Sequence, residues 1–283
     1  MNLQKIMDRK ALPTPFLDTG KLPWDQPEFS ARALREHLDD SSDSGSRSEE
    51  MIREHVRFMM STLSLRPRSR VLDMGCGPGL YCREMGRNGI ITTGIDISPS
   101  AIDYAERLGI PYARFILGDI RDIPLPRNQD AAVMTYGEFN MFSEDDARRI
   151  LSRVNLSLKA GGYLLLEVST KELADPSGCP SQGWWSYPGG DIWSDEPYLA
   201  LKEAIYLRDS HTEVTRYYII HQGSGDVEEY SETRKVYRKE RILRMLSDHG
   251  FKETTVYSSM TGGEYTGENL FAVFVSRKES REC

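Results

Sequence analysis

The residues best suited to chemistry lie in a glycine-rich segment that follows an apolar stretch. Residues 71–79 read Val-Leu-Asp-Met-Gly-Cys-Gly-Pro-Gly. The glycines at 75, 77 and 79 let the backbone turn sharply and let a ligand lie against it. A dinucleotide-binding loop, GxGxxG, would need glycine at position 80, where this sequence has Leu80. Asp73, before the first glycine, suits a cationic ligand and would repel a pyrophosphate, so we favour a cationic ligand over a dinucleotide or an ordinary glycine turn.

Two further carboxylates follow apolar stretches. Asp96, in Gly94-Ile95-Asp96-Ile97-Ser98, comes 21 residues after Gly75, where a carboxylate can bind both hydroxyls of a ribose. Asp119, in the segment 117–120, can accept a hydrogen bond from an adenine amino group, with Ile120 against the ring. The spacing indicates a ligand built on adenosine, although Asp96 could instead be a helix-capping residue.

The elements that must position these residues alternate between strand and helix. This alternation predicts an α/β fold in which right-handed crossovers build a parallel sheet with helices on both faces. A later helix and two last strands complete a Rossmann-like, seven-stranded sheet. Strands are expected over 71–74, 90–96, 113–117, 130–136, 162–168, 251–257 and 269–276, and helices over 80–87, after Ser98-Pro99, from Ser143 to Gly161, and over 238–249.

Two segments fall outside this alternation. The first contains a helix from a Ser30 cap to Leu38, a polar break over 39–45, and a helix after a capping box at Ser46 and Glu49. The second is too long for a plain connection and carries strand-like stretches at 198–207, 212–221 and 227–237. We therefore expect four parts: an N-terminal helical arm 1–63 as lid or substrate cap, a ligand-binding core 64–169, an antiparallel β insertion 170–236 as substrate lid, and the end of the core 237–283.

Composition excludes several classes of protein. The 283 residues carry a net charge of −7, which disfavours stable binding to nucleic acid. The cysteines Cys76, Cys82, Cys179 and Cys283 have no CxxC spacing, so we expect no metal site and free thiols in a reducing cytoplasm. The N-terminus resembles neither a signal peptide nor a membrane anchor, and we expect a cytoplasmic monomer or homodimer without a membrane partner.

The motifs resemble those of the class I S-adenosylmethionine-dependent methyltransferases. The matching segments are 73–79, 94–98, 118–120 and the turn 158–162; the resemblance covers about residues 50–168 and, more loosely, 238–276. The arm and the insertion resemble, more weakly, those of bacterial small-molecule methyltransferases. The resemblance implies S-adenosylmethionine as cofactor and S-adenosylhomocysteine as product. It implies these contacts: Asp73, Gly75, Cys76 and Gly77 at the methionine end, Asp96 and Ile97 at the ribose, Asp119 and Ile120 at the adenine, and Tyr136 beside the cofactor.

The acceptor of the methyl group would face the end of the fourth strand, at Tyr136, Glu138 and Phe139. This edge lacks the Asn/Asp-Pro-Pro-aromatic sequence of amino-methylating enzymes of DNA, which argues against such substrates. Glu138 could hold an amine or take a proton from a hydroxyl, or it could be a structural carboxylate. Tyr136 is a second catalytic candidate.

The insertion supplies further candidates. Trp184, Trp185, Tyr187 and Trp193 could form an aromatic wall for an apolar or cationic acceptor, or a local core that holds the loop. His211, and also His221, could reach the site as a base, although a lone histidine on a strand is usually structural.

Three functions remain open. The first is transfer of a methyl group to an N, O or C atom of a small metabolite by in-line displacement, which needs no universal catalytic residue. The second is an S-adenosylmethionine-binding enzyme that does not transfer methyl, such as a cyclase or a decarboxylase. The third is a non-catalytic scaffold that kept the fold.

Overall fold

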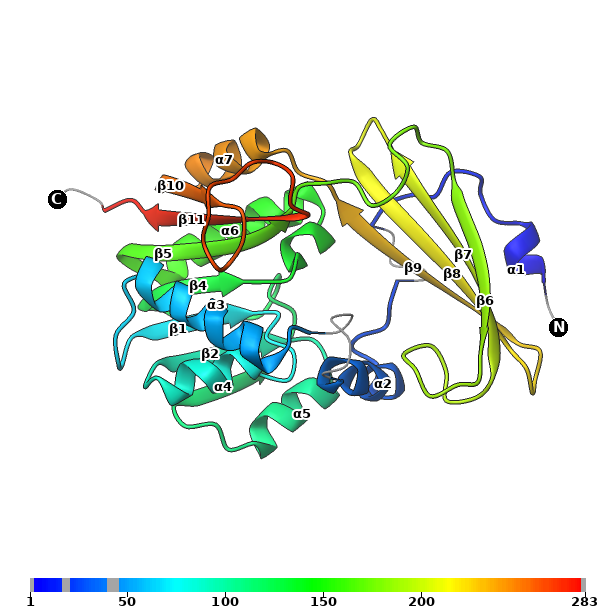
Figure 1. The fold of residues 1–283 in the computed structure, drawn as a ribbon, viewed down its shortest axis with the longest axis horizontal. Helices are drawn as coiled ribbons and strands as arrows, with labels where there is room; N and C mark the ends of the chain where they lie inside the picture. The colour runs from blue at the N-terminus through cyan, green and yellow to red at the C-terminus, as the bar shows by residue number, and fades with distance from the viewer. Residues whose placement is uncertain (1–2, 17–20, 40–45, 281–283) are drawn as a thin grey trace.

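Seven strands form the central sheet of the computed structural model, which describes residues 3–16, 21–39 and 46–280. Their order is β10-β11-β5-β4-β1-β2-β3, as Figure 1 shows. The first five strands in the chain run parallel, and β11 pairs antiparallel with β5. The predicted Rossmann-like sheet is therefore confirmed. The strands are β1 (Arg70–Met74), β2 (Ile91–Asp96), β3 (Ala113–Leu117), β4 (Gln129–Met134), β5 (Leu158–Ser169), β10 (Phe251–Tyr257) and β11 (Phe271–Lys278).

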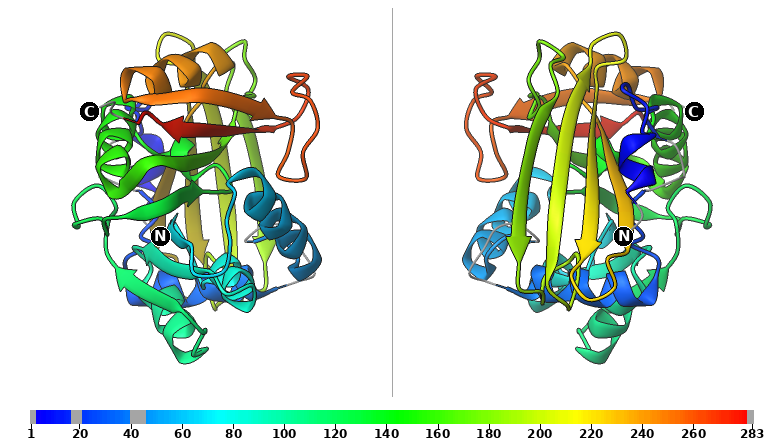
Figure 2. Two further views of the ribbon diagram at one scale, coloured as in Figure 1. Left: turned by 90° about the vertical axis from the view of Figure 1, so that its left-hand side faces the viewer. Right: turned by 90° about the vertical axis from the view of Figure 1, so that its right-hand side faces the viewer.

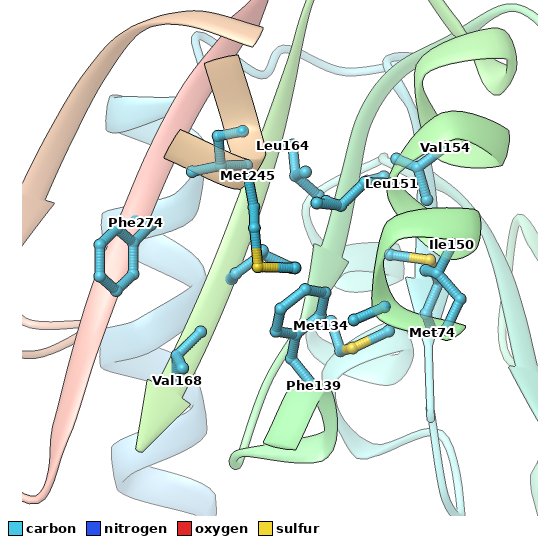
Figure 3. Packing of buried hydrophobic residues seen from close by; sticks show 14 of the residues in the cluster. Met74, Met134, Phe139, Ile150, Leu151, Val154, Leu164, Val168, Met245 and Phe274 are labelled. Carbon is cyan, nitrogen blue, oxygen red and sulfur yellow. The ribbon is translucent and has the colours of Figure 1, made fainter. Parts of the chain in front are cut away.

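Helices cover both faces of this sheet because successive strand residues point to opposite sides. Val71 packs in one core with residues of α3 and α4, whereas its neighbour Leu72 packs in the other core with residues of α6 and α7. Figure 3 shows the second core, where Met74 and Met134 lie with side chains of both helices. The helices are α3 (Glu49–Thr62), α4 (Leu80–Arg87), α5 (Pro99–Arg107), α6 (Glu144–Ser157) and α7 (Lys239–Asp248).

The insertion folds into a separate antiparallel sheet in the order β6-β7-β8-β9. It lies beyond the edge where β1, β4 and β5 end (Figure 1). Asn140, which follows β4, donates a hydrogen bond to the Lys235 carbonyl at 2.7 Å and joins the two sheets. The four strands are β6 (Ser181–Tyr187), β7 (Tyr198–Leu207), β8 (Thr212–His221) and β9 (Val227–Lys235); the first of them was not predicted as a strand.

The N-terminal arm contacts both sides of this second sheet. Near α1 (Gln4–Met7), Arg9 forms an ion pair with Glu203 at 3.3 Å, and α1 lies on the side away from the central sheet (Figure 2). The next helix, α2 (Pro27–Leu38), lies between the two sheets, where Phe29 packs against Tyr230. In the described part of the chain, every helix is too short or too polar to cross a membrane.

Three predicted element ends were wrong. The second helix begins at Pro27, not at Ser30, because proline suits a first turn and Ser30 is buried against α5. Ser48, not Ser46, caps α3 and accepts a hydrogen bond from the backbone nitrogen of Met51. The helix α6 ends at Ser157 rather than Gly161, because Leu158 is already extended and pairs with Gln129. Of the polar break at 39–45, all but Asp39 lies outside the described residues.

Candidate cofactor and acceptor site

The glycine loop presents bare backbone at the carboxyl end of β1. The nitrogens of Gly75 and Cys76 both donate to the carbonyl of Ile95, at 2.9 and 3.1 Å, and so fix the turn. Gly75 and Gly77 have φ values of 74° and 51°, a region that side-chain-bearing residues rarely adopt. A Cβ placed on Gly77 would have a His37 carbon, 4.0 Å away, as its nearest neighbour. The loop thus leaves room for a ligand against its backbone, as S-adenosylmethionine requires.

Asp96 ties this loop to the start of α5. One carboxylate oxygen accepts from the nitrogen of Gly77 and the other from the nitrogen of Ser98, both at 2.8 Å. Burial raises the pKa of Asp96, and these two hydrogen bonds oppose that effect. Because each carboxylate oxygen has two acceptor sites, the group can still accept from ribose hydroxyls. The half-buried Ile97 lies beside it in the chain.

Asp73 lies almost fully buried at the end of β1, with 1% of its surface exposed. The Sγ of Cys82 donates to it at 3.4 Å. Burial raises the pKa of Asp73 to about 7, and the nearby carboxylate of Asp96 adds to the rise. A cationic ligand on the loop would therefore favour the ionised form of Asp73.

The residues predicted for adenine already have partners. Asp119 accepts hydrogen bonds from Arg121, at 2.8 Å from its backbone nitrogen and at 2.6 Å from its guanidinium. Ile120 packs in the main hydrophobic core. An adenine amino group would have to share Asp119 with Arg121, and the predicted adenine role of both residues stays a prediction.

A left-handed turn follows β4 and carries Glu138. Tyr136 and Gly137 have φ values of 60° and 76°. The carboxylate of Glu167, at the end of β5, accepts the Tyr136 backbone N–H at 2.6 Å, and the Glu167 carbonyl accepts that of Gly137 at 3.2 Å. The guanidinium of Arg47 forms an ion pair with Glu167 at 3.1 Å and lies over the Tyr136 ring. Glu167 and Arg47 thus support this turn.

The support for this turn was not predicted from the sequence. An acidic residue inside the apolar run 164–168 was the available signal for Glu167. Nothing in the local pattern marks Arg47, because its partners come from β5 and from the Tyr136 and Phe271 rings.

Glu138 lies over the glycine loop. A Cβ placed on Gly75 would be 3.0 Å from the Cγ of Glu138. Burial raises the pKa of Glu138 to about 8, and repulsion from Asp96 and Glu232 contributes. A carboxyl group of this kind can exchange a proton near neutral pH.

Phe139 does not line this site, contrary to the sequence-based prediction. Its side chain is fully buried and packs on Tyr237, with ring centroids 5.7 Å apart, inside the main core. The short 3-10 helix Glu138–Met141 turns it away from its neighbour Glu138. The Tyr136 ring lies 6.1 Å from that of Phe271, and its predicted place beside the cofactor stays a prediction.

The predicted aromatic wall is split by strand geometry. Trp184 and Trp185 are neighbours in β6, so they point to opposite faces. Trp184 is 73% exposed, whereas Trp185 packs edge-on against Tyr217 at 6.5 Å. The two tryptophans therefore cannot line one pocket. The exposed Tyr187 lies at the far end of β6 against Tyr198, at 6.1 Å.

His211, which was expected to reach the site as a base, lies in a turn and binds another residue. It is exposed, has a φ of 47°, and lies between β7 and β8. Its Nδ1 shares a hydrogen bond of 2.8 Å with the hydroxyl of Tyr206. His221 is also engaged, with Ser194 at 3.3 Å and Glu228 at 3.2 Å. The contacts support the structural alternative for both histidines.

Helix α2 packs next to the glycine loop and the start of α5. The hydroxyl of Ser30 lies 2.7 Å from that of Ser98 and accepts from the Ser100 nitrogen at 2.9 Å. From the other side of the helix, Arg32 donates to the carbonyl of Ile192 in the insertion at 3.0 Å. The arm therefore contacts the predicted ribose region as well as the insertion.

Comparison with known proteins agrees with this geometry. Residues 71–162 match the model of a methyltransferase domain family. An uncharacterised methyltransferase of Synechocystis sp. is 28% identical over 107 residues, 38% of this chain and half of its own length. The glycine/sarcosine N-methyltransferase of Aphanothece halophytica is 24% identical over 82% of this chain and 86% of its own.

The fold is also shared with a solved structure. An S-adenosylmethionine-dependent methyltransferase from Clostridium acetobutylicum superimposes with a TM-score of 0.67 and 14% identity, over 87% of this chain and 98% of that chain. The glycine loop, the position of Asp96 and the match of residues 71–162 to a methyltransferase domain together support a class I S-adenosylmethionine-dependent methyltransferase.

Proposed function

We propose that this protein transfers the methyl group of S-adenosylmethionine to a small molecule held between the carboxyl edge of the central sheet and the four-stranded sheet. The observation that carries the proposal is the position of Glu138 over Gly75. It puts a carboxyl group with a pKa of about 8 against the loop expected to hold the methionine end. The glycine/sarcosine N-methyltransferase, a relative named for small acceptors, supports a small-molecule substrate.

In this reaction, each part of the site would have its own role. The loop at Gly75 and Gly77 would hold the cofactor, with Asp96 at its ribose. Bound S-adenosylmethionine supplies an electrophilic methyl group on a sulfonium. Glu138 would orient the acceptor and take its proton, while α2 and the insertion exclude water from the space between the sheets.

Two other functions compete with this one. A cyclase or decarboxylase on the same fold would consume the cofactor or its own substrate without forming a methylated product. A scaffold would bind the cofactor and turn over nothing. The position of Glu138 favours transfer over a scaffold, because a buried carboxyl group with a raised pKa beside a ligand-binding loop is typical of functional sites.

A labelled cofactor distinguishes the three. The protein would be incubated with methyl-labelled S-adenosylmethionine and a metabolite extract, and products would be sought by mass spectrometry. We expect a labelled product to form together with S-adenosylhomocysteine, and Glu138→Gln to reduce its formation by about 10²-fold or more while the cofactor still binds. Cofactor binding with no labelled product would contradict the proposal.

A further inference from the structure

The inner face of the four-stranded sheet, which we define by Tyr217, Tyr230, Glu232 and Arg234, is turned toward the central sheet. Alternation puts the three β9 residues of this set on one side of the strand, and the register puts Tyr217 beside Tyr230. Tyr230 packs on Phe29 of α2 at 5.8 Å. Arg234 donates to the Lys171 carbonyl just beyond β5 at 3.0 Å. These contacts at both ends fix which side faces the site.

Carboxylates meet across the space between the two sheets. Glu138 comes from the central sheet and Glu232 from the inner face, and each is partly shielded from solvent. The charged groups that act on Glu138 are Asp96 and Glu232, both acidic. An acceptor atom that reaches Glu138 therefore lies near the carboxyl groups of Asp96 and Glu232.

Glu232 has cationic neighbours, but each has another partner. Its ionised form is stabilised by Arg234 and Lys202 and destabilised by Glu213. Arg234 is hydrogen-bonded to Glu213 at 2.8 Å. The ammonium of Lys202 lies 5.8 Å from the centre of the Tyr217 ring, on an exposed side chain. Lys202, which pairs with Tyr217, and Arg234 lie on the same inner face as Glu232, but neither acts on the pKa of Glu138.

Aromatic rings stand next to this acidic space. The Trp193 ring lies 4.4 Å from Tyr217 and 5.6 Å from Tyr230, measured between centroids. Ring faces bind flat apolar groups and cations, and they gain little from anions. Acidic groups beside such rings form an environment for a cation that carries an apolar or cyclic body.

We infer that the acceptor is an amine that enters as an ammonium ion, with its nitrogen at Glu138 and its body against Trp193, Tyr217 and Tyr230. The inference rests on the proposed function and specifies the substrate class of that site. The carboxyl groups of Glu138, Glu232 and Asp96 disfavour phosphate and carboxylate acceptors in the same position.

Proton transfer also favours an amine over an alcohol. The ammonium proton moves to the carboxylate of Glu138, and the freed nitrogen lone pair forms the new bond to the methyl carbon. The bond from that carbon to the sulfonium sulfur breaks, its electron pair stays on sulfur, and Glu138 later releases its proton to water.

The difference in pKa between donor and acceptor sets how unfavourable this proton transfer is. The pKa of Glu138 is about 8 and that of an alkylammonium group is about 10.4, so the equilibrium constant for transfer to Glu138 is unfavourable by roughly 10²-fold. For an alcohol with a pKa near that of water, about 15.7, the same equilibrium constant is unfavourable by roughly 10⁸-fold. A phenol would leave an anion among carboxylates.

Matched compound pools test the inference. Full-length protein and methyl-labelled S-adenosylmethionine would be incubated with pools of amines, alcohols and phenols that share the same carbon skeletons. We expect labelled product from the amine pool at about tenfold or more over the others. Glu232→Gln should raise the Michaelis constant for the best amine by about tenfold. The control is Glu229→Gln, which removes a carboxylate from the opposite, exposed face of the same strand. This variant should leave the Michaelis constant for the best amine unchanged.

The outcomes separate the two proposals. Labelled product confined to alcohols or phenols would overturn the amine inference and leave methyl transfer to a small molecule intact. An unchanged Michaelis constant in Glu232→Gln, with the variant melting like the wild type, would also overturn it. Failure of all three pools, in protein that binds the cofactor, would overturn the proposed function itself.

Discussion

The side-chain carboxylate of Glu167 on β5 accepts a hydrogen bond, at 2.6 Å, from the backbone nitrogen of Tyr136, which follows the neighbouring strand β4. Tyr136 has a φ of 60°, a conformation that costs free energy and persists only where its surroundings hold it. Glu167 is itself held by Arg47 at 3.1 Å. Because Glu138 lies two residues after Tyr136, the ion pair positions the candidate proton acceptor.

Glu167→Gln should lower both stability and turnover. The substitution leaves the half-buried Arg47 without its carboxylate, and breaking a shielded ion pair from one side costs about 2–4 kcal/mol. It also loosens the turn that carries Glu138, so kcat should fall about 10-fold or more. Chemical denaturation and steady-state kinetics would measure the two effects.

A solvent-exposed ion pair provides the control for this variant. Glu49 pairs with Arg87 on the surface at 3.1 Å, so Glu49→Gln should leave kcat unchanged. If Glu167→Gln lost stability but kept the wild-type kcat and pH profile, the ion pair would have a structural role only.

Raised pKa values predict how stability varies with pH. The pKa of Glu138 is about 8 in the folded protein against 4.5 as its ordinary value, and that of Asp73 is about 7 against 3.8. Between the ordinary and the folded values, the folded state binds more protons than the unfolded state. The free energy of unfolding therefore falls as pH rises through that window, and the loss is complete above about pH 8.

Glu138→Gln removes one of these titrations. At pH 9 the variant should be more stable than the wild type by about 1–3 kcal/mol, and the difference should vanish near pH 4.5. Thermal melting of both proteins across this range measures it. If the difference in melting temperature between the two proteins were the same at every pH, Glu138 would not titrate with a raised pKa.

The sequence predicted the parts of this molecule that depend on local pattern. The strand–loop–helix signal at 71–79 and the cap at Ser98 were found because apolar periodicity, glycine and capping hydroxyls act within a few residues. The face on which Trp184 lies was missed, because it depends on the register of a strand that pattern alone did not reveal. Tyr217 and Tyr230 were missed for the same reason: only pairing with neighbouring strands shows which side faces the cofactor loop.

Asp96→Ala should weaken cofactor binding by about 1.5–3 kcal/mol, the scale for charge-assisted hydrogen bonds. The structure adds a second reason, because Asp96 also holds Gly77 and Ser98 in place at 2.8 Å. Titration calorimetry with S-adenosylhomocysteine would measure the loss. Asp103→Asn on the exposed side of α5, where Asp103 pairs with Arg107, should bind as the wild type does. Equal affinities for all three proteins would show that the ribose is held elsewhere.

Ser30→Ala tests whether α2 acts on the cofactor as well as on the acceptor. From the sequence, the arm was expected to cover the acceptor only. In the structure the Ser30 hydroxyl bonds to both Ser98 and Ser100, next to the carboxylate of Asp96. Removing it should weaken binding of S-adenosylhomocysteine by about 0.5–1.5 kcal/mol. It should also raise the acceptor's Michaelis constant, because α2 also contacts the insertion through Arg32. The control is Ser61→Ala, which removes an exposed hydroxyl that donates to the Phe58 carbonyl at 3.0 Å within α3. If Ser30→Ala changed the acceptor's constant and left cofactor affinity at the wild-type value, α2 would be a cap for the acceptor alone.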